Sequence, residues 1–297
     1  MPFLVKPTKL RPKQVEDIER LFRRCNEHDG SRYVFDNSDE FKRAEEVNTF
    51  LLYEGRILAA SMHIFAPTKK EAEIIGLTLP ERRRQGHFTK LLGEVRKELY
   101  GRSIPSILFV CDGGSRDGNG VVQHLQAEYE YSEYLMRCTD DRKRAPGGKD
   151  GGNGTIELVP AQRADIPRLK QISTEAFDRE ERESESILEE FLSSTGRDLY
   201  LILYEGGTVG MIGIHAEGQR HYIHGFCIDP AFRGRGIGRR ALVQAVNLCL
   251  EKDRERRIEL EVQIDNTQAL GLYGSAGFSV LTEFRYYRSM SPQGVLE

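Results

Sequence analysis

Apolar and polar residues follow two kinds of regular pattern in the second half of the chain. Residues 258–264 alternate strictly between apolar and polar side chains, which predicts a strand with one apolar face. Residues 238–251 repeat apolar positions at helical spacing, which predicts an amphipathic helix. Similar patterns predict strands at 155–159, 199–204, 209–216, 222–228 and 279–287, and helices at 164–177, 186–193 and 267–275. The order β-α-α-β-β-β-α-β-α-β indicates a mixed α/β sheet.

The first half of the chain repeats the second at an offset of about 150 residues. Three segments recur in the same order: LLYEGRILAASMHIF from Leu51 as LILYEGGTVGMIGIHA from Leu201, Arg83 and Gly86 as Arg233 and Gly236, and Glu133-Tyr134 as Glu283-Phe284. The stretch between the halves is rich in glycine and charge and has no large apolar residue, so it predicts a flexible linker. We therefore predict two tandem α/β domains at 1–138 and 155–297, joined by a linker at 139–154.

Composition narrows the function without identifying it. The 297 residues include 43 Lys and Arg against 46 Asp and Glu, a net charge of −3, which gives no general attraction for nucleic acid or an anionic membrane. No apolar run reaches the ~18 residues of a membrane span, and the first residues have no signal-peptide core, so we expect a cytoplasmic protein. The five cysteines are scattered without a CxxC pair, which favours buried free thiols over disulfides or a zinc site.

A glycine-rich loop stands between a predicted strand and a predicted helix. The segment IDPAFRGRGIGRRAL spans residues 228–242 and carries three alternating glycines. Such a loop exposes consecutive backbone N–H groups at a positive helix N-terminus, where a phosphate or pyrophosphate binds. A dinucleotide motif starting at Gly234 would need glycine where Arg239 stands. The chain has no G-x-x-x-x-G-K-[ST] motif, which excludes a P-loop nucleoside triphosphatase at the motif level.

Two motifs of this region resemble the signatures of the GNAT acetyltransferase superfamily. Arg233-x-x-Gly236-x-Gly238 resembles the [QR]-x-x-G-x-[GA] signature, with the Asp-Pro-aromatic-Arg lead-in of the family's fourth strand. Further on, Asn266, Ala269, Leu272-Tyr273 and Gly277-Phe278 resemble N-x-x-A-x-x-L-Y-x-x-x-G-F. The resemblance covers residues 155–297 and, more loosely, 1–138. The second half resembles the ribosomal-protein N-terminal acetyltransferases in particular, and the tandem layout is similar to that of the mycothiol synthases.

The resemblance implies a binding site for acetyl-CoA. The loop amides of that family bind the cofactor's pyrophosphate, the strand before the loop pairs with its pantetheine arm, and an asparagine bonds its amide region. Carried over to this chain, the implied cofactor-binding residues are Phe226, Cys227, Ile228, Arg233, Gly234, Arg235, Gly236, Ile237, Gly238, Arg239, Asn266 and Tyr273. We expect no metal, because the family needs none and the chain offers no cluster of ligands.

The chemistry requires an amine that arrives neutral and a proton for the departing thiolate. Tyr273 matches the family tyrosine that donates to the leaving sulfur. Glu261, twelve residues earlier on the polar face of its strand, is the first candidate for the general base, and the same L-E-V spacing occurs in the ribosomal-protein enzymes. Glu259 on the same face is the alternative, and His221 and His224 are weaker candidates because a lone strand histidine is usually structural.

The first half is a degenerate copy. Arg83 and Gly86 match the loop signature, but Phe88 stands at its last small position, where we expect it to crowd the turn. The second signature is absent, and the tyrosine has no clear counterpart. We therefore expect a non-catalytic first domain. Whether it keeps CoA binding or serves only as a scaffold stays open.

The leading prediction is an N-acetyltransferase that transfers the acetyl group of acetyl-CoA directly to a primary amine, on a small molecule, a protein N-terminus or a lysine. A catalytically silent acyl-CoA-binding or regulatory protein is the alternative. Nucleic-acid binding through Arg82–Arg84 and Arg254–Arg257 is disfavoured, since acidic residues interrupt both clusters. We expect neither nucleic acid nor membrane as a partner. The acceptor and the oligomeric state stay open.

Overall fold

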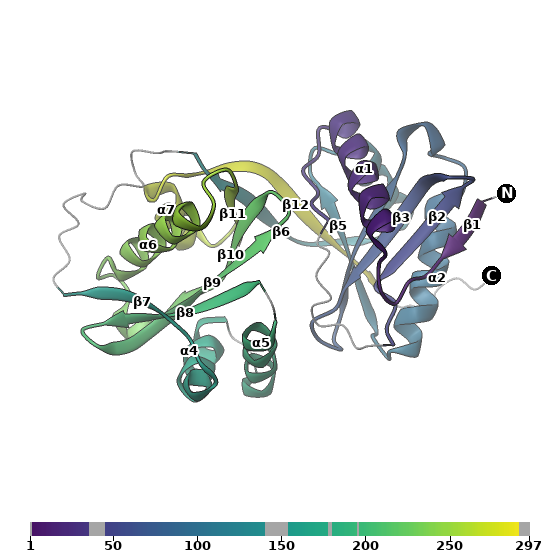
Figure 1. Cartoon of the computed structure of the whole chain (residues 1–297). Coiled ribbons are helices and arrows are strands. Elements are labelled where there is room, and N and C mark those ends of the chain that lie inside the picture. Colours follow the sequence, from purple (N-terminus) through teal and green to yellow (C-terminus); the bar gives the residue numbers. More distant parts are fainter. Residues whose placement is uncertain (1, 36–44, 140–153, 178–179, 195, 291–297) are drawn as a thin grey trace. The chain divides into compact units, whose positions relative to one another are not determined.

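The computed structural model describes residues 2–35, 45–139, 154–177, 180–194 and 196–290 (Figure 1). The chain forms two compact units, one made of residues 1–133 with 282–297 and the other of residues 134–281. Of the predicted linker 139–154, residues 140–153 lie outside the described residues. Each unit is a mixed sheet with helices on both faces, as the alternation of strand and helix patterns predicts.

The second unit follows the predicted order of elements closely. Its sheet runs β6-β11-β10-β9-β8-β7, where β6 is Glu128–Cys138. The strands are antiparallel from β7 to β10 and parallel between β10 and β11. The elements are β7 (Ile156–Pro160), a 3-10 turn (Arg163–Asp165), α4 (Ile166–Phe177), α5 (Glu181–Ser193), β8 (Arg197–Tyr204), β9 (Gly207–Glu217), β10 (Arg220–Ile228), a second 3-10 turn (Pro230–Phe232), α6 (Ile237–Lys252), β11 (Arg257–Gln263), α7 (Thr267–Ser275) and β12 (Phe278–Met290).

Two apolar layers hold this unit together, one on each face of the sheet. The predicted stripe of α6 (Leu242, Ala245, Val246 and Cys249) is buried against strand residues such as Ile223 and Leu260. On the other face, α4 and α5 pack against strand residues that alternate with the first set. In Figure 1 the pair α6 and α7 and the pair α4 and α5 cover opposite faces. Burial of each large apolar side chain contributes about 1.5–3 kcal/mol.

The first unit has the same arrangement in the order β1-β2-β3-β4-β5-β12. Helix α2 covers one face, and the buried Ile18, Leu21, Phe22 and Cys25 attach α1 to the sheet. The elements are β1 (Pro2–Val5), α1 (Pro12–Asp29), β2 (Thr49–Glu54), β3 (Ile57–Phe65), β4 (Ala72–Thr78), a 3-10 turn (Pro80–Arg82), α2 (His87–Gly101), β5 (Ser106–Asp112), α3 (Arg116–His124) and β6 (Glu128–Cys138).

The last strand of each half does not stay within the predicted domains 1–138 and 155–297. The first unit takes residues 282–290 of β12 into its sheet, where Phe284–Met290 pair antiparallel with Ser106–Asp112 of β5. The second unit takes residues 134–138 of β6. Strand β12 extends into the first unit because it is long, with 13 residues, and because its apolar side chains Phe284 and Tyr286 are buried there. A domain made only of residues 1–138 would therefore lack a strand of its own sheet.

Candidate functional site

The candidate site of the second unit lies where β10 and β11 stop pairing. The parallel register joins Arg220–Ile223 to Arg257–Leu260 and goes no further. A bulge follows between His224 and Cys227, at Gly225 with φ +56°. Beyond it, β10 still pairs with β9, through Cys227 and Met211. Residues 226–228 therefore present one edge of backbone groups away from β9, as the pantetheine prediction requires.

The glycine loop leads from this strand into α6. Gly234 and Gly236 adopt left-handed φ values of +76° and +74°, which favour glycine. Gly236 caps α6 without any side-chain hydrogen bond to the first turn. The first N–H groups of a helix have no acceptor within it, so those of α6 remain available to an anion. Gly238 has a different role: a Cβ there would lie 2.9 Å from Cδ1 of Leu272 and 3.6 Å from Cζ of Phe226.

Two arginines of the loop, Arg233 and Arg235, already donate hydrogen bonds within the protein. Nε of Arg233 donates to the carbonyl oxygen of Ile228 at 2.9 Å, which ties the loop to the end of β10. Arg235 donates to the Ala231 carbonyl at 3.1 Å and lies 5.2 Å from the ring centre of Phe232. The Arg233 guanidinium has no ion-pair partner among the described residues. The loop thus keeps positive charge beside the free amides, and these residues fit a pyrophosphate.

Helix α7 places two further predicted residues. Asn266 is its N-cap, and the side-chain oxygen accepts from the Ala269 N–H at 3.1 Å. Tyr273 is 9% exposed, with its ring 6.4 Å from that of Phe226. Its hydroxyl has no hydrogen-bond partner among the described residues. Burial, and secondly the neighbouring Cys227 thiol, raise the pKa of Tyr273 to about 12, so this tyrosine keeps its proton at neutral pH.

Glu261 lies on β11, one residue past Leu260, the last residue that pairs with β10. Its side chain faces away from α6, as the strand alternation predicts. Burial raises the pKa of this carboxyl above its ordinary 4.5, against the charge of Arg220 and a hydrogen bond from Tyr222, which lower it, while Glu259 adds to the increase. A raised pKa brings a carboxylate nearer to the range useful for taking a proton from an amine.

The alternative bases are held differently. Glu259 is only 2% exposed, and its carboxylate accepts from Arg137 at 2.6 Å and is paired with Arg220 at 3.4 Å. The predicted polar face of β11 is therefore buried at this position. Burial lowers the pKa of His224 to about 3, with Arg197 and His215 adding to the effect, and the ring packs 4.6 Å from that of Phe191.

The other histidine considered as a base, His221, is 2% exposed, and burial also lowers its pKa. The imidazoles are thus poor proton acceptors near neutral pH. Sequence reasoning passed over Tyr222, Arg220 and Arg137. The signal available was their period-two placement on the face that Glu259 and Glu261 share.

The first unit repeats the loop with the same backbone. Arg83 has φ −67° and ψ 160° where Arg233 has φ −66° and ψ 161°. Gly86 has φ 78° and ψ 3° where Gly236 has φ 74° and ψ 1°. Arg84 stands at the Gly234 position with φ +60°, a conformation that costs a side-chain-bearing residue about 1–2 kcal/mol.

The expected crowding by Phe88 does not occur. A Cβ on Gly76 would lie 2.8 Å from Cε2 of Phe88, so the ring occupies space that a glycine on β4 leaves. The second unit has the reverse pair, with Phe226 on the strand and Gly238 on the helix. One aromatic ring therefore fills the strand–helix contact in each unit, supplied from opposite sides.

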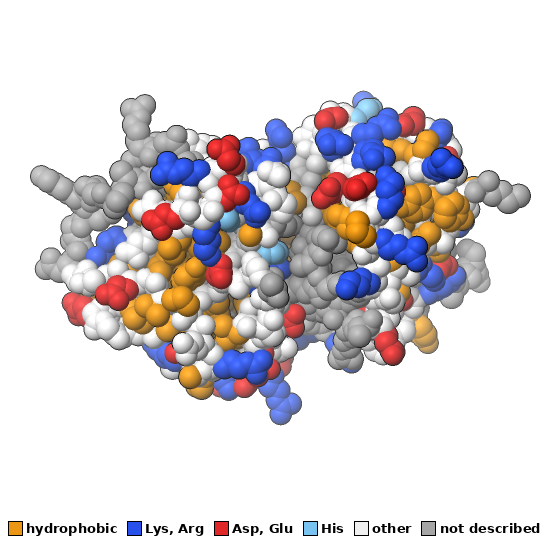
Figure 2. Space-filling model, in the orientation of Figure 1, with side chains coloured by type: hydrophobic (Ala, Val, Ile, Leu, Met, Phe, Trp, Pro, Cys, Tyr) orange, Lys and Arg blue, Asp and Glu red, His pale blue; other side chains and the backbone are white. Residues whose placement is uncertain are grey.

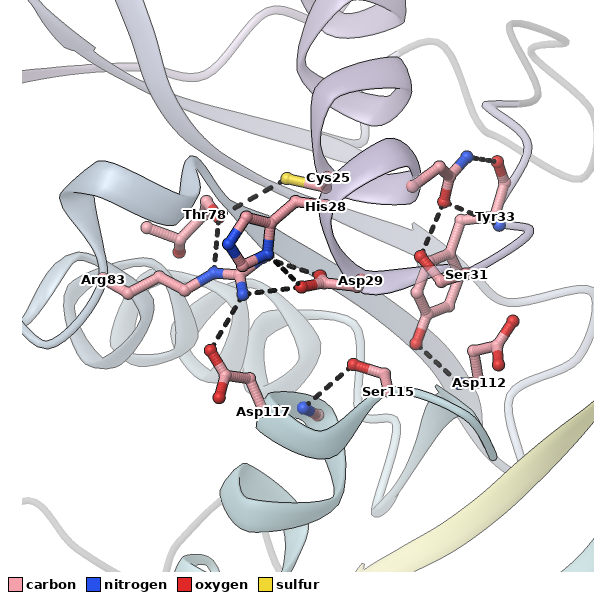
Figure 3. A network of polar contacts seen from close by, with 12 residues as sticks. Cys25, His28, Asp29, Ser31, Tyr33, Thr78, Arg83, Asp112, Ser115 and Asp117 are labelled. Atoms are coloured by element: carbon pink, nitrogen blue, oxygen red, sulfur yellow. Dashed lines mark hydrogen bonds and ion pairs between the residues drawn. The ribbon is translucent and has the colours of Figure 1, made fainter.

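The charge at the two loops differs. In Figure 3, Arg83 of the first unit lies between two carboxylates, Asp29 at 2.6 Å and Asp117 at 2.8 Å. These hydrogen bonds, that of Asp29 first, raise the pKa of Arg83 beyond its already high value. Asp29 ends α1 and Asp117 lies in the first turn of α3. The positive charge that Arg233 leaves available is thus neutralised at Arg83.

The first unit also lacks both candidate catalytic side chains. Ser115 caps α3 as Asn266 caps α7, through the equivalent hydrogen bond to a backbone N–H. Counting from these two caps, Val122 stands at the position of Tyr273 and Val110 at that of Glu261. Neither valine can transfer a proton.

Comparison with known proteins places this geometry in a family. Residues 166–278 match the model of the acetyltransferase (GNAT) family. The N-alpha-acetyltransferase RimI of Mycobacterium tuberculosis is 35% identical over 139 residues, which cover 45% of this chain and 85% of that protein. A GCN5-related N-acetyltransferase from Sphaerobacter thermophilus has a TM-score of 0.72 at 18% identity, covering 97% of this chain and 95% of its own. A tandem GNAT protein from the clavulanic acid biosynthesis pathway has a TM-score of 0.72 at 13% identity, covering 98% of both chains.

The chain therefore belongs to the GNAT family of acetyltransferases. It is an acetyl-CoA-dependent N-acetyltransferase whose second half is similar to N-alpha-acetyltransferases. The two solved structures, at this low identity, support the fold and the tandem arrangement. The likeness to mycothiol synthases stays a prediction. Among the described residues, no helix is long and apolar enough to span a membrane.

Proposed function

We propose that the second unit transfers the acetyl group of acetyl-CoA to a primary amine, with the α-amine of a protein N-terminus as the leading acceptor. The observation that carries the proposal is the pair Glu261 and Tyr273, placed where β10 and β11 diverge beside the uncapped start of α6. The similarity to an N-alpha-acetyltransferase supports the α-amine over a lysine or a small molecule. A silent acyl-CoA-binding protein would need neither side chain.

The residues of this unit fit acetyl-CoA, which supplies an acetyl group activated as a thioester. The amides of residues 234–239 would hold the pyrophosphate, with Arg233 adding charge. The backbone of residues 226–228 would pair with the pantetheine arm, and the side-chain amide of Asn266 would contact its amide region.

The protein groups then control two protons. Glu261 accepts a proton from the incoming ammonium, because only the neutral amine has the lone pair needed for attack. Tyr273 keeps its hydroxyl proton, buried against Phe226 and near Cys227, ready for donation to a departing thiolate. Glu259 takes no part as a base, because its carboxylate is already paired with two arginines.

We propose a structural role for the first unit, with one acetyl-CoA bound per chain. The aspartates at Arg83 place negative charge where a pyrophosphate would lie, and the valines at positions 110 and 122 leave no proton-transfer group. The sheet of this unit also includes residues 284–290 of β12, which pair with β5.

We propose no nucleic-acid or membrane partner. In each of the two basic clusters some arginines pair with carboxylates, such as Arg82 with Glu54 at 2.9 Å and Arg256 with Asp253 at 3.0 Å. Figure 2 shows acidic and basic side chains interspersed on the visible face of each unit. Such a surface gives no extended field of one sign.

Acetylation of a short peptide with a free N-terminus, followed by mass spectrometry, tests the proposal. Glu261→Gln and Tyr273→Phe should each lower kcat by about 10²–10⁴-fold, the range for loss of a proton-transfer group. Glu157→Gln and Tyr100→Phe change exposed residues outside the site and should leave the rate unchanged. The assignment of the catalytic pair fails if both site variants keep wild-type rates. Acetylation of lysine-containing peptides with blocked N-termini, at equal efficiency, would remove the preference for the α-amine.

A further inference from the structure

Glu259 belongs to a buried ionic cluster that the reaction itself does not use. Arg137 of β6 donates to Oε1 of Glu259 from Nε at 2.8 Å and from Nη2 at 2.6 Å. Arg220 of β10 donates to Oε2 at 3.4 Å. Glu259 is 2% exposed and Arg220 is 8% exposed. A carboxylate buried this deeply is tolerated only when it is paired and hydrogen-bonded, and Arg137 and Arg220 supply that pairing.

The cluster continues to an aromatic ring. The guanidinium carbon of Arg220 lies 4.7 Å from the ring centre of Tyr222, two residues further along the same face of β10. A guanidinium over a tyrosine face is worth about 0.5–2 kcal/mol, depending on how far it is desolvated. Since Glu259 occupies one side of Arg220, it restricts where this guanidinium can stack. Tyr222 also stands opposite Glu259 in the strand register.

The ring leads to the candidate base. Glu261 lies one alternate position beyond Glu259 on β11, so it shares the face that carries Arg220 and Tyr222. Both of these groups lower the pKa of Glu261. The groups that act on Glu261 among the described residues are Arg220 and Tyr222 from β10 and Glu259 from its own strand. The contacts thus run from Arg137 through Glu259 and Arg220 to Tyr222. They end on the face that carries Glu261, on which Arg220 also acts directly by its charge.

We propose that Glu259, Arg220 and Tyr222 are positioning residues, which hold the Glu261 carboxylate in the place and the charge state in which it accepts a proton from the incoming ammonium. Glu259 orients Arg220, Arg220 packs on Tyr222, and the Tyr222 hydroxyl holds Glu261. This assignment rests on the proposed function for its catalytic meaning, while the coupling to Glu261 is a property of the folded chain alone. In this account the buried Glu259 anchors Arg220 and does not itself exchange a proton in the reaction.

Titration of Glu261 tests the coupling without any substrate. In protein carrying ¹³C-labelled glutamate, the side-chain carboxyl signal of Glu261 is assigned by its loss in Glu261→Gln and followed by NMR as pH changes. Tyr222→Phe keeps the ring but removes the hydroxyl, and Arg220→Met keeps a stem over the ring but removes the charge. Arg220→Met leaves Glu259 its closer partner Arg137, which favours folding. Each variant should move the Glu261 midpoint to higher pH by about one unit, a tenfold change in proton affinity.

The double variant separates a positioning line from independent effects. If Arg220 acts through Tyr222, Arg220→Met with Tyr222→Phe should shift the midpoint less than the sum of the two single shifts. Glu259→Gln discriminates further: loss of a nearby negative charge alone would move the midpoint to lower pH, whereas loss of the Arg220 anchor moves it to higher pH. Glu157→Gln is the matched control and should leave the midpoint unchanged.

The proposal is overturned if the single variants leave the midpoint in place, if their shifts add in full, or if Glu259→Gln lowers it. The acid limb of kcat/KM should move with the NMR midpoint, while KM for acetyl-CoA stays constant. A wild-type chain that shows the titration coupling but acetylates no amine would contradict the proposed function and leave the coupling established.

Discussion

In the first unit the ring of Phe88 on α2 fills the space that Gly76 leaves on β4. This packing predicts a strong energetic coupling between positions 76 and 88. In Gly76→Ala, the added Cβ would meet Cε2 of Phe88 at 2.8 Å and Cε of Met62 at 2.9 Å. Ordinary carbon contacts lie near 3.5–4.0 Å. Met62 can move its flexible end, but the Phe88 ring packs against the α2 core and has little room. Such overpacking costs about 1–3 kcal/mol of the free energy of unfolding.

Removal of the ring should relieve that cost. Phe88→Ala alone leaves a cavity, and since Phe88 is half-buried we expect a loss of about 2 kcal/mol, below the 3–5 kcal/mol of a fully buried phenylalanine. In the Phe88→Ala background the Cβ at position 76 enters this cavity, so Gly76→Ala should then cost little. The double-mutant cycle should therefore show a favourable coupling of about 1–2 kcal/mol.

Urea unfolding followed by far-UV circular dichroism measures these differences. Gly93→Ala is the matched control, because Gly93 lies in α2, the helix that carries Phe88, and its added Cβ would have no neighbouring atom within 4 Å. That change should stabilise the protein by about 0.5–1 kcal/mol through the lower backbone entropy of the unfolded chain. Additivity of the two substitutions within about 0.5 kcal/mol would refute the packing argument.

Three further predictions follow from the titrating groups. Burial favours the neutral form of Asp29, but hydrogen bonds from Arg83 and His28 outweigh it and lower the pKa. The stabilisation by Asp29 should thus be complete above its ordinary pKa of 3.8 and disappear as pH falls through the lower folded value, and Asp29→Asn should flatten the pH dependence of unfolding there. Because the pKa of Tyr273 is about 12, ultraviolet titration of wild type against Tyr273→Phe should show no ionisation of this residue below pH 10. Burial raises the pKa of Cys25 and Cys111 to about 11, so a thiol reagent at pH 8 should react with them only after denaturant is added.

The sequence predicted most elements of the fold because their patterns are local. The stripe of α6 and the alternation of β11 appear as predicted, and α7 has the predicted bounds of 267–275. Helix α5 begins at Glu181, five residues before the predicted start, because its first turn is acidic and polar and carries little apolar periodicity. The five cysteines are buried and free, as predicted.

Pairing between distant segments could not be predicted from such local patterns. The alternation of β12 indicates a strand but does not say which strand it joins, and the pairing of Tyr287 with Phe109 crosses from the second half to the first. The crowding prediction for Phe88 was wrong for a similar reason, because its packing partner Gly76 is twelve residues away and carries no side chain to give a signal. Long-range packing decides both cases.

The site shows the same division. Motif spacing predicted the glycine loop before α6 and the short helix that carries Asn266 and Tyr273, because each depends on a fixed position along one element. The pairing of Glu259 involves Arg137, which is 122 residues away in sequence. Period-two alternation put Glu259 and Glu261 on one face, but only tertiary packing separates the buried ion pair from the carboxylate whose pKa is raised.

Calorimetric titration of acetyl-CoA into the full-length protein tests the central claim, that the second unit alone provides the acetyl-CoA site. We predict one site per chain, abolished by Gly236→Glu, whose side chain places a negative charge at the uncapped start of α6. The same substitution at the matched position of the first unit, Gly86→Glu, should leave that site intact. Two sites in the wild type, or one site that survives Gly236→Glu and is lost in Gly86→Glu, would contradict the account.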